Sequence, residues 1–213
     1  MTRKHLALLT ALFALASPVH AGGPTIVAPD PVPDVMPAPV EGVDWSGPYA
    51  GLSYGRVSGL FDMPAFGQFD FNDGRATGAF LGYNLQRGKL VYGGELSYAT
   101  VSDMVISDPD LGSNDTLDKL MELRGRVGFS LGNALIYGAV GMSKGNFTIN
   151  GVDKSTGSGT SYGVGMDYRF TDRVFVGLDY TRHKLGGTNN NPGNAFEFEA
   201  PLDALSLRVG LSF

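Results

Sequence analysis

The stretch that decides the fold is Leu205-Ser206-Leu207-Arg208-Val209-Gly210-Leu211-Ser212-Phe213, at the end of the sequence. Its apolar side chains occupy every odd position, so a β-strand would place all of them on one face. The other face carries only small or charged residues, among them Arg208. A strand that separates lipid from a polar lumen has this pattern, so the ending predicts one strand of a membrane β-barrel.

Seven further segments alternate in a similar way. Strands are expected near 49–58, 75–86, 90–101, 117–130, 134–144, 161–170, 174–183 and 204–213. Connections at 87–89, 131–133 and 171–173 are short, whereas those near 59–74, 102–116, 145–160 and 184–203 are long. Short turns at one end and long loops at the other are typical of outer-membrane barrels. The sequence thus predicts an all-β fold, an eight-stranded antiparallel up-and-down transmembrane β-barrel; a soluble lipocalin-like barrel is the alternative fold.

The sequence before the barrel divides into two parts. Residues 1–21 begin with basic residues, continue with an apolar run at 6–16 and end on small residues, which predicts a cleaved secretory signal peptide. Residues 22–44 contain six prolines and predict an extended periplasmic spacer, followed by the barrel at 45–213. Export and a barrel together predict the bacterial outer membrane as the location.

Composition argues against several functional classes. There is no cysteine, so neither a disulfide nor a thiolate metal site can form. Loss of residues 1–21 would remove Arg3 and Lys4 and no acidic residue, changing the formal net charge from −5 to −7, which disfavours nucleic acid as a partner. The acidic segment 107–115 lacks the order of an EF-hand, and the glycines at 157–159 lack the context of a phosphate loop. We therefore expect no cofactor and no metal.

Charged residues recur on the face of the strands that would point into the lumen. They are Glu95, Glu122, Arg124, Arg126, Asp167, Arg169, Asp179 and Arg208. An eight-stranded barrel is only wide enough inside for side chains to fill it. Unpaired charges there would be costly. Four acids facing four arginines therefore predict a salt-bridged plug, with a narrow ion or proton path as the alternative.

Five basic residues have the opposite, outward parity, each at the long-loop end of its strand. They are Arg56, Arg75, Lys119, Lys144 and Arg182. Long basic side chains near a membrane interface can reach anionic headgroups, and arginine can bind a phosphate through two hydrogen bonds. We expect these five to form a collar that contacts lipopolysaccharide phosphates; the alternative is that the strand ends simply meet water there.

A family resemblance rests on two kinds of segment. One is the entry strand Asp44-Trp45-Ser46-Gly47-Pro48-Tyr49-Ala50-Gly51-Leu52-Ser53-Tyr54-Gly55, and the other is the set of glycine-rich strands such as Gly163-Val164-Gly165-Met166-Asp167-Tyr168. From about residue 43 onward the chain resembles the small outer-membrane β-barrel domain family, the porin-family or opacity-type surface proteins of alphaproteobacteria. The resemblance implies a monomer with a role in envelope integrity, adhesion or host contact. Leu207, Val209, Leu211 and Phe213 are similar to the terminal signal that the barrel-assembly machinery recognises.

The function predicted from these features is an envelope-structural or surface-interaction role without catalysis. Its partners would be outer-membrane lipid, lipopolysaccharide and the assembly machinery. A narrow porin-like diffusion channel is one alternative. An enzyme acting on outer-leaflet lipid is another, but His183 is the only histidine after residue 21, no serine and carboxylate are marked as its partners, and we expect it exposed at the rim.

Overall fold

The computed structural model describes residues 42–63, 67–70, 72–108, 113–149, 153–189 and 196–213. The predicted signal peptide and most of the predicted spacer lie outside these ranges. No helix in the described part of the chain is long and apolar enough to cross a bilayer.

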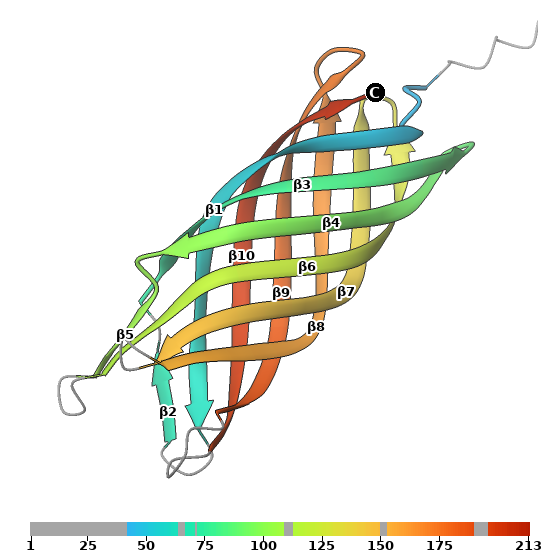
Figure 1. Cartoon of the computed structure of the whole chain (residues 1–213). Coiled ribbons are helices and arrows are strands. Elements are labelled where there is room, and N and C mark those ends of the chain that lie inside the picture. The colour runs from blue at the N-terminus through green and yellow to red at the C-terminus, as the bar shows by residue number, and fades with distance from the viewer. Residues whose placement is uncertain (1–41, 64–66, 71, 109–112, 150–152, 190–195) are drawn as a thin grey trace, which may run out of the picture. The chain divides into compact units, whose positions relative to one another are not determined.

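Eight long strands form the wall of a closed barrel. They are β1 (Gly47–Met63), β3 (Gly74–Arg87), β4 (Leu90–Ser102), β6 (Ser113–Leu131), β7 (Ala134–Ile149), β8 (Asp153–Arg169), β9 (Val174–Asn189) and β10 (Phe196–Ser212). Successive long strands pair antiparallel, and β1 pairs with β10 through Tyr49 opposite Ser212, which closes the sheet (Figure 1). The predicted fold class is confirmed. Two short strands, β2 (Gly67–Asp70) and β5 (Val105–Asp108), pair with the long-loop ends of β1 and β6.

The strands are longer than their sequence pattern predicts, and the extra length lies at the long-loop end. β8 begins at Asp153 rather than near 161, β9 continues to Asn189 rather than 183, and β10 begins at Phe196 rather than 204. At the other end the predicted short turns are present. Gly88 and Gly132 have φ angles of 60° and 64°, which glycine adopts without strain in two-residue hairpins.

The outward face carries the apolar side chains that the alternation placed there. Leu52 is 68% exposed, Val140 69% and Phe213 76%, values typical of side chains with lipid rather than protein around them. Tyr137 is buried inside and Gly138 lies outside, which fixes the orientation of β7, the strand whose alternation is weakest. The sequence alternation therefore predicts correctly which side chains lie on the outer face of the barrel.

Three layers of side chains fill the interior. The layer at the short-turn end is aromatic and aliphatic and consists of Trp45, Tyr49, Phe80, Val91, Leu135, Tyr137 and Phe175. Charged residues occupy the middle. The layer at the long-loop end is again apolar and consists of Val57, Ala76, Val101, Met104, Leu117, Leu120, Phe147, Leu185, Phe198, Ala200, Leu202 and Ala204.

The apolar layer at the long-loop end explains why the strands continue past their predicted limits. In β10 the apolar positions are odd from Leu205 onward and face outward, but Phe198, Ala200 and Leu202 are even and buried inside. The apolar face thus changes from outside to inside near Ala204. Beyond this point the wall is built like that of a water-soluble barrel, with an apolar core and a polar exterior.

Candidate functional site

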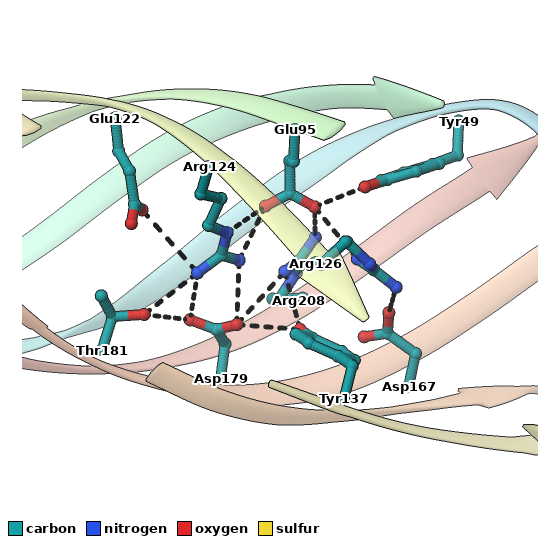
Figure 2. Close-up of polar contacts among 10 residues, drawn as sticks. All are labelled: Tyr49, Glu95, Glu122, Arg124, Arg126, Tyr137, Asp167, Asp179, Thr181 and Arg208. Carbon is teal, nitrogen blue, oxygen red and sulfur yellow. Dashed lines mark hydrogen bonds and ion pairs between the residues drawn. The ribbon is translucent and has the colours of Figure 1, made fainter. Parts of the chain in front are cut away.

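The centre of the lumen is organised around the carboxylate of Glu95 on β4. Arg124 donates to its Oε1 from Nε at 3.0 Å and from Nη2 at 2.7 Å, and Arg126 and Arg208 donate to Oε2 at 3.1 and 2.5 Å. The Tyr49 hydroxyl donates a further hydrogen bond to Oε2 at 2.9 Å. Figure 2 shows these donors converging from different strands on one carboxylate that is 2% exposed.

Asp179 on β9 is a second acceptor for the same arginines. Arg124 binds it through two nitrogens, at 3.0 and 2.9 Å, and Arg208 lies 3.4 Å from Oδ2. Thr181 donates to Oδ1 at 2.7 Å and the Tyr137 hydroxyl donates to Oδ2 at 2.8 Å (Figure 2). Arg124 therefore links β4 to β9 across the lumen through two carboxylates.

Arg126 joins the charged middle layer to the aromatic layer beneath it. Its Nη2 donates to Asp167 at 2.8 Å, and its guanidinium lies 4.0 Å from the centre of the Tyr137 ring and 5.1 Å from that of Tyr49. Arg208 lies 4.0 Å from the centre of the Phe80 ring. These cation–π contacts stabilise the guanidinium groups of two arginines that are buried inside the barrel.

Arg169 is predicted as a member of the charge network, but the structure places it elsewhere. Its Nη1 donates to the backbone carbonyl of Asp44 at 2.8 Å, and its guanidinium stacks on Trp45 at 4.5 Å. Its Nη2 donates to Ser212 Oγ at 3.1 Å. It holds the chain before β1 against the short-turn end of the barrel, because β8 ends there and its last inward side chain reaches the mouth rather than the middle.

Trp45 occupies that mouth. It is 3% exposed, its backbone N–H donates to the side chain of Gln86 at 2.7 Å, and its ring centre lies 6.2 Å from that of Phe175. The backbone N–H of Ser46 donates to Asp44 at 2.8 Å and lowers the pKa of that carboxyl. The entry segment is thus part of the interior packing at this end.

Because Arg169 lies outside the charge network, the predicted equality of four acidic residues and four arginines does not hold. Three arginines remain in the network, and Glu122 is the carboxylate with the weakest contact, 3.7 Å from Arg124 Nη1. Glu122 is nevertheless only 7% exposed. The network therefore has one more carboxyl group than it has guanidinium groups.

His183 is buried, contrary to the expectation of an exposed rim histidine. It is 2% exposed, and its Nδ1 lies 2.8 Å from Ser143 Oγ on β7. The error arises because β9 continues six residues past the predicted end, so residue 183 lies inside the wall. A cavity of about 60 Å³ lies beside it and beside Glu122, large enough for a few water molecules.

Sequence reasoning missed the neutral members of the site. Tyr49, Tyr137, Thr181 and Ser143 all have inward parity, and each hydrogen-bonds to a charged group or to His183. Parity alone could have found them, since a buried hydroxyl needs a partner.

The five collar residues have different surroundings. Arg56 pairs with Asp73, Arg75 pairs with Asp103, and Arg182 lies 3.8 Å from Asp203. Lys119 and Lys144 are exposed on β6 and β7, and neither forms an ion pair with a carboxylate in the described part of the chain. Asp73 and Asp103 lie between strands, in segments whose conformation has no sequence signature, and Asp203 lies in the part of β10 that precedes its predicted start.

The four residues of the predicted assembly signal lie on the outer face of β10. Leu207, Val209 and Leu211 are between 48% and 53% exposed, and Phe213 follows the last residue of the strand. The backbone N–H of Phe213 donates to the carbonyl of Pro48 at 3.0 Å, at the seam where β10 meets β1.

Comparison with known proteins gives a family for the chain. A family described as outer membrane protein beta-barrel domain matches residues 7–213. A 22 kDa outer membrane protein of Rhizobium leguminosarum bv. viciae is 29% identical over 173 residues, covering 78% of this chain and 76% of the relative. A 25 kDa outer-membrane immunogenic protein of Brucella abortus is 27% identical over 190 residues, with 84% of each covered.

Solved barrels are similar at lower identity. Neisserial surface protein A is 16% identical with a TM-score of 0.49, covering 79% of this chain and 98% of that one. The attachment invasion locus protein Ail of Yersinia pestis is 11% identical with a TM-score of 0.47, covering 77% and 99%. The relatives and the fold place the protein in the bacterial outer membrane. The chain belongs to the outer membrane protein beta-barrel domain family.

Proposed function

We propose that the protein is a surface barrel without catalytic activity whose lumen is closed by paired charges, and that it has an envelope-structural or surface-interaction role. The observation that carries this proposal is the layered interior. Glu95, Arg124 and Arg208 fill the middle of the lumen at 5% exposure or less, with apolar layers on both sides. An ion that crossed would have to displace these interactions and pass through two mainly apolar layers.

Planar-bilayer recording of the purified full-length protein tests the closed lumen. We expect no steady single-channel steps from the wild-type protein. Steps that disappear on substitution of Glu95 or Arg124 would support the alternative of a narrow diffusion channel and would overturn the proposal.

The contact between Ser143 and His183 is the observation that favours an enzyme, and its surroundings argue against one. No carboxylate in the described part of the chain hydrogen-bonds to His183, and the pair lies inside the wall at 4% and 2% exposure. A nucleophilic pair needs an orienting group and access to substrate. Lipid A mass profiles of cells with wild-type protein and with Ser143→Ala should be identical; a modification lost only in the variant would contradict this assignment.

We further propose that the outer rim contacts lipopolysaccharide phosphates, and that Lys119 and Lys144 contribute more than the three arginines. The arginines already have aspartate partners, whereas the two lysines are exposed without one among the described residues. Replacement of Lys119, Lys144 and Arg182 by glutamate should reduce co-purified lipopolysaccharide and weaken the outer-membrane barrier. Unchanged retention would exclude the contact.

A further inference from the structure

The outer wall of the barrel has a groove in the middle of its lipid-facing band. The groove has a volume of about 780 Å³ and runs over β4, β6, β7, β8 and β9. Its lining includes Gly125, Gly138, Tyr92, Val140 and Val164.

The groove exists because two outward positions on neighbouring strands lack side chains. A Cβ added to Gly125 would have no neighbouring heavy atom closer than 4.0 Å, and one added to Gly138 none closer than 3.9 Å. Glycines on the inner face are different: a Cβ on Gly165 would lie 2.4 Å from the Tyr137 ring. Gly165 thus makes room for an aromatic ring of this chain, whereas the space above Gly125 and Gly138 is not filled by the described residues.

Lys119 and Lys144 lie at the external end of the same two strands, each six residues from the groove glycine of its strand. At about 3.3 Å per residue and a strand tilt of roughly 40°, six residues correspond to about 15 Å of depth. That is half of a hydrocarbon core of about 30 Å, the thickness of one leaflet. A lipid whose headgroup meets the lysines would therefore place the end of an acyl chain at the groove.

The two lysines are close enough to share one phosphate group. Lys119 is opposite Asn146 in the register and Lys144 is opposite Met121, so the lysines are diagonal neighbours, whose Cα atoms are about 7–8 Å apart. Asp118 is the acidic group nearest in sequence, and its carboxylate accepts hydrogen bonds from Thr116 at 2.9 Å and Thr148 at 2.5 Å. Another cation contacts the lining of the groove, since Lys184 Nζ is 5.7 Å from the centre of the Tyr162 ring.

We infer that this face binds one phosphorylated lipid of the outer leaflet, with the phosphate on Lys119 and Lys144 and one acyl chain in the groove over Gly125 and Gly138. A second copy of the chain fits this face less well. A two-fold interface in the membrane would bring the same residues together at the same depth, so the lysines of both copies would face each other. The inference deepens the proposed contact with lipopolysaccharide and rests on it.

Native mass spectrometry of the purified full-length protein with diphosphoryl lipid A tests the inference. The wild-type protein should retain one lipid A. Gly125→Leu fills the groove and should weaken retention about tenfold, whereas Ala79→Leu places the same side chain on the outer face of β3, away from the groove, and should not. Gly138→Leu is a second, independent test of the groove. Heat-dependent gel migration of each variant shows whether it is folded.

The phosphate contact has its own matched pair of variants. Lys119→Glu with Lys144→Glu should lower retention at least as strongly as Gly125→Leu. Lys89→Glu with Arg173→Glu makes the same change of charge at the opposite, short-turn end and should leave retention unchanged. Lipid A without its phosphates should be retained weakly by the wild-type protein, and inorganic phosphate at the same concentration should not displace lipid A.

Each contrary outcome has a distinct meaning. If the lysine variant loses lipid A but both leucine variants keep it, the groove is wrong and the rim contact stands. If neither kind of variant changes retention, both proposals fail. Equal retention of the lipid without phosphates would overturn the role of the lysines. A wild-type dimer that Gly125→Leu converts to a monomer would assign the groove to a second copy.

Discussion

Replacement of Glu95 by glutamine is the sharpest test of how the lumen is held together. Glu95 accepts four hydrogen bonds from three arginines and one from Tyr49. Glutamine has nearly the same shape, but it removes the negative charge and turns an NH₂ group toward guanidinium donors. Removing one partner from a buried ion-pair network costs about 3–5 kcal/mol, because the remaining charges are left without compensation. We expect a loss of that size in the free energy of unfolding.

Glu122 provides the matched control within the same lumen. It is a buried glutamate like Glu95, yet its single ion pair is the 3.7 Å contact with Arg124. It is also the carboxyl group in excess over the three arginines of the network. Glu122→Gln should therefore change the free energy of unfolding by less than about 1 kcal/mol, or should stabilise the barrel slightly.

Urea unfolding in detergent micelles or lipid vesicles measures both variants. The chain contains one tryptophan, Trp45, which is buried inside the barrel, so its fluorescence reports on the interior. The reasoning is refuted if Glu95→Gln lies within 1 kcal/mol of wild type, or if the two variants are equally destabilised.

Three further substitutions have defined outcomes. Arg169→Ala removes the side chain that stacks on Trp45, so the emission of the folded protein should shift to longer wavelength as water reaches the ring. Gly210→Val should destabilise the barrel by about 1–3 kcal/mol or more in urea unfolding, because a Cβ there would lie 2.2 Å from the Phe175 ring. Phe213→Ala removes a ring that contacts lipid rather than the protein core, so it should change the unfolding free energy by less than the roughly 3–5 kcal/mol of a core Phe→Ala change, yet it should lower the amount assembled in the outer membrane of cells.

Controls for these variants come from exposed positions. Arg173→Ala removes an exposed arginine at the short-turn end and should leave the emission unchanged, and Gly125→Ala adds a Cβ into open space and should be tolerated. Leu52→Ala removes a lipid-facing side chain away from the last strand and should not reduce assembly. An unshifted emission, a stable Gly210→Val barrel or full assembly without the terminal ring would each contradict the corresponding prediction.

The lipid-facing wall was predictable from the sequence because its signal is local. Alternation with a period of two depends on no tertiary contact, so Leu207, Val209 and Leu211 could be assigned to the outer face from their spacing. The inward position of Glu95 and Arg208 follows from the same parity. Which inward charges meet depends on strand stagger around the barrel, and for that reason Arg169 was wrongly grouped with the others.

The strand ends differ from the predicted ones because the apolar alternation does not keep one phase along a strand. Along β10 the apolar residues occupy even positions up to Ala204 and odd positions from Leu205 onward. Only the odd-numbered alternation is part of the predicted strand near 204–213. A search for a change of phase, rather than for the loss of alternation, would have extended β9 past His183 and placed that side chain inside. The same extension of β10 would place Asp203 opposite Arg182, whereas Asp73 and Asp103 lie between strands and have no comparable signal.

The change of phase near Ala204 also divides the barrel wall into a lipid-facing part and a part with its own apolar core. On the short-turn side of this point the outer wall is apolar and faces lipid. On the long-loop side the wall encloses an apolar core of its own, so this upper part does not need lipid to stabilise it. The packing of the upper part is then independent of the packing of the membrane-spanning part. Substitutions in the upper part should therefore affect the membrane-spanning part less than substitutions below the change of phase.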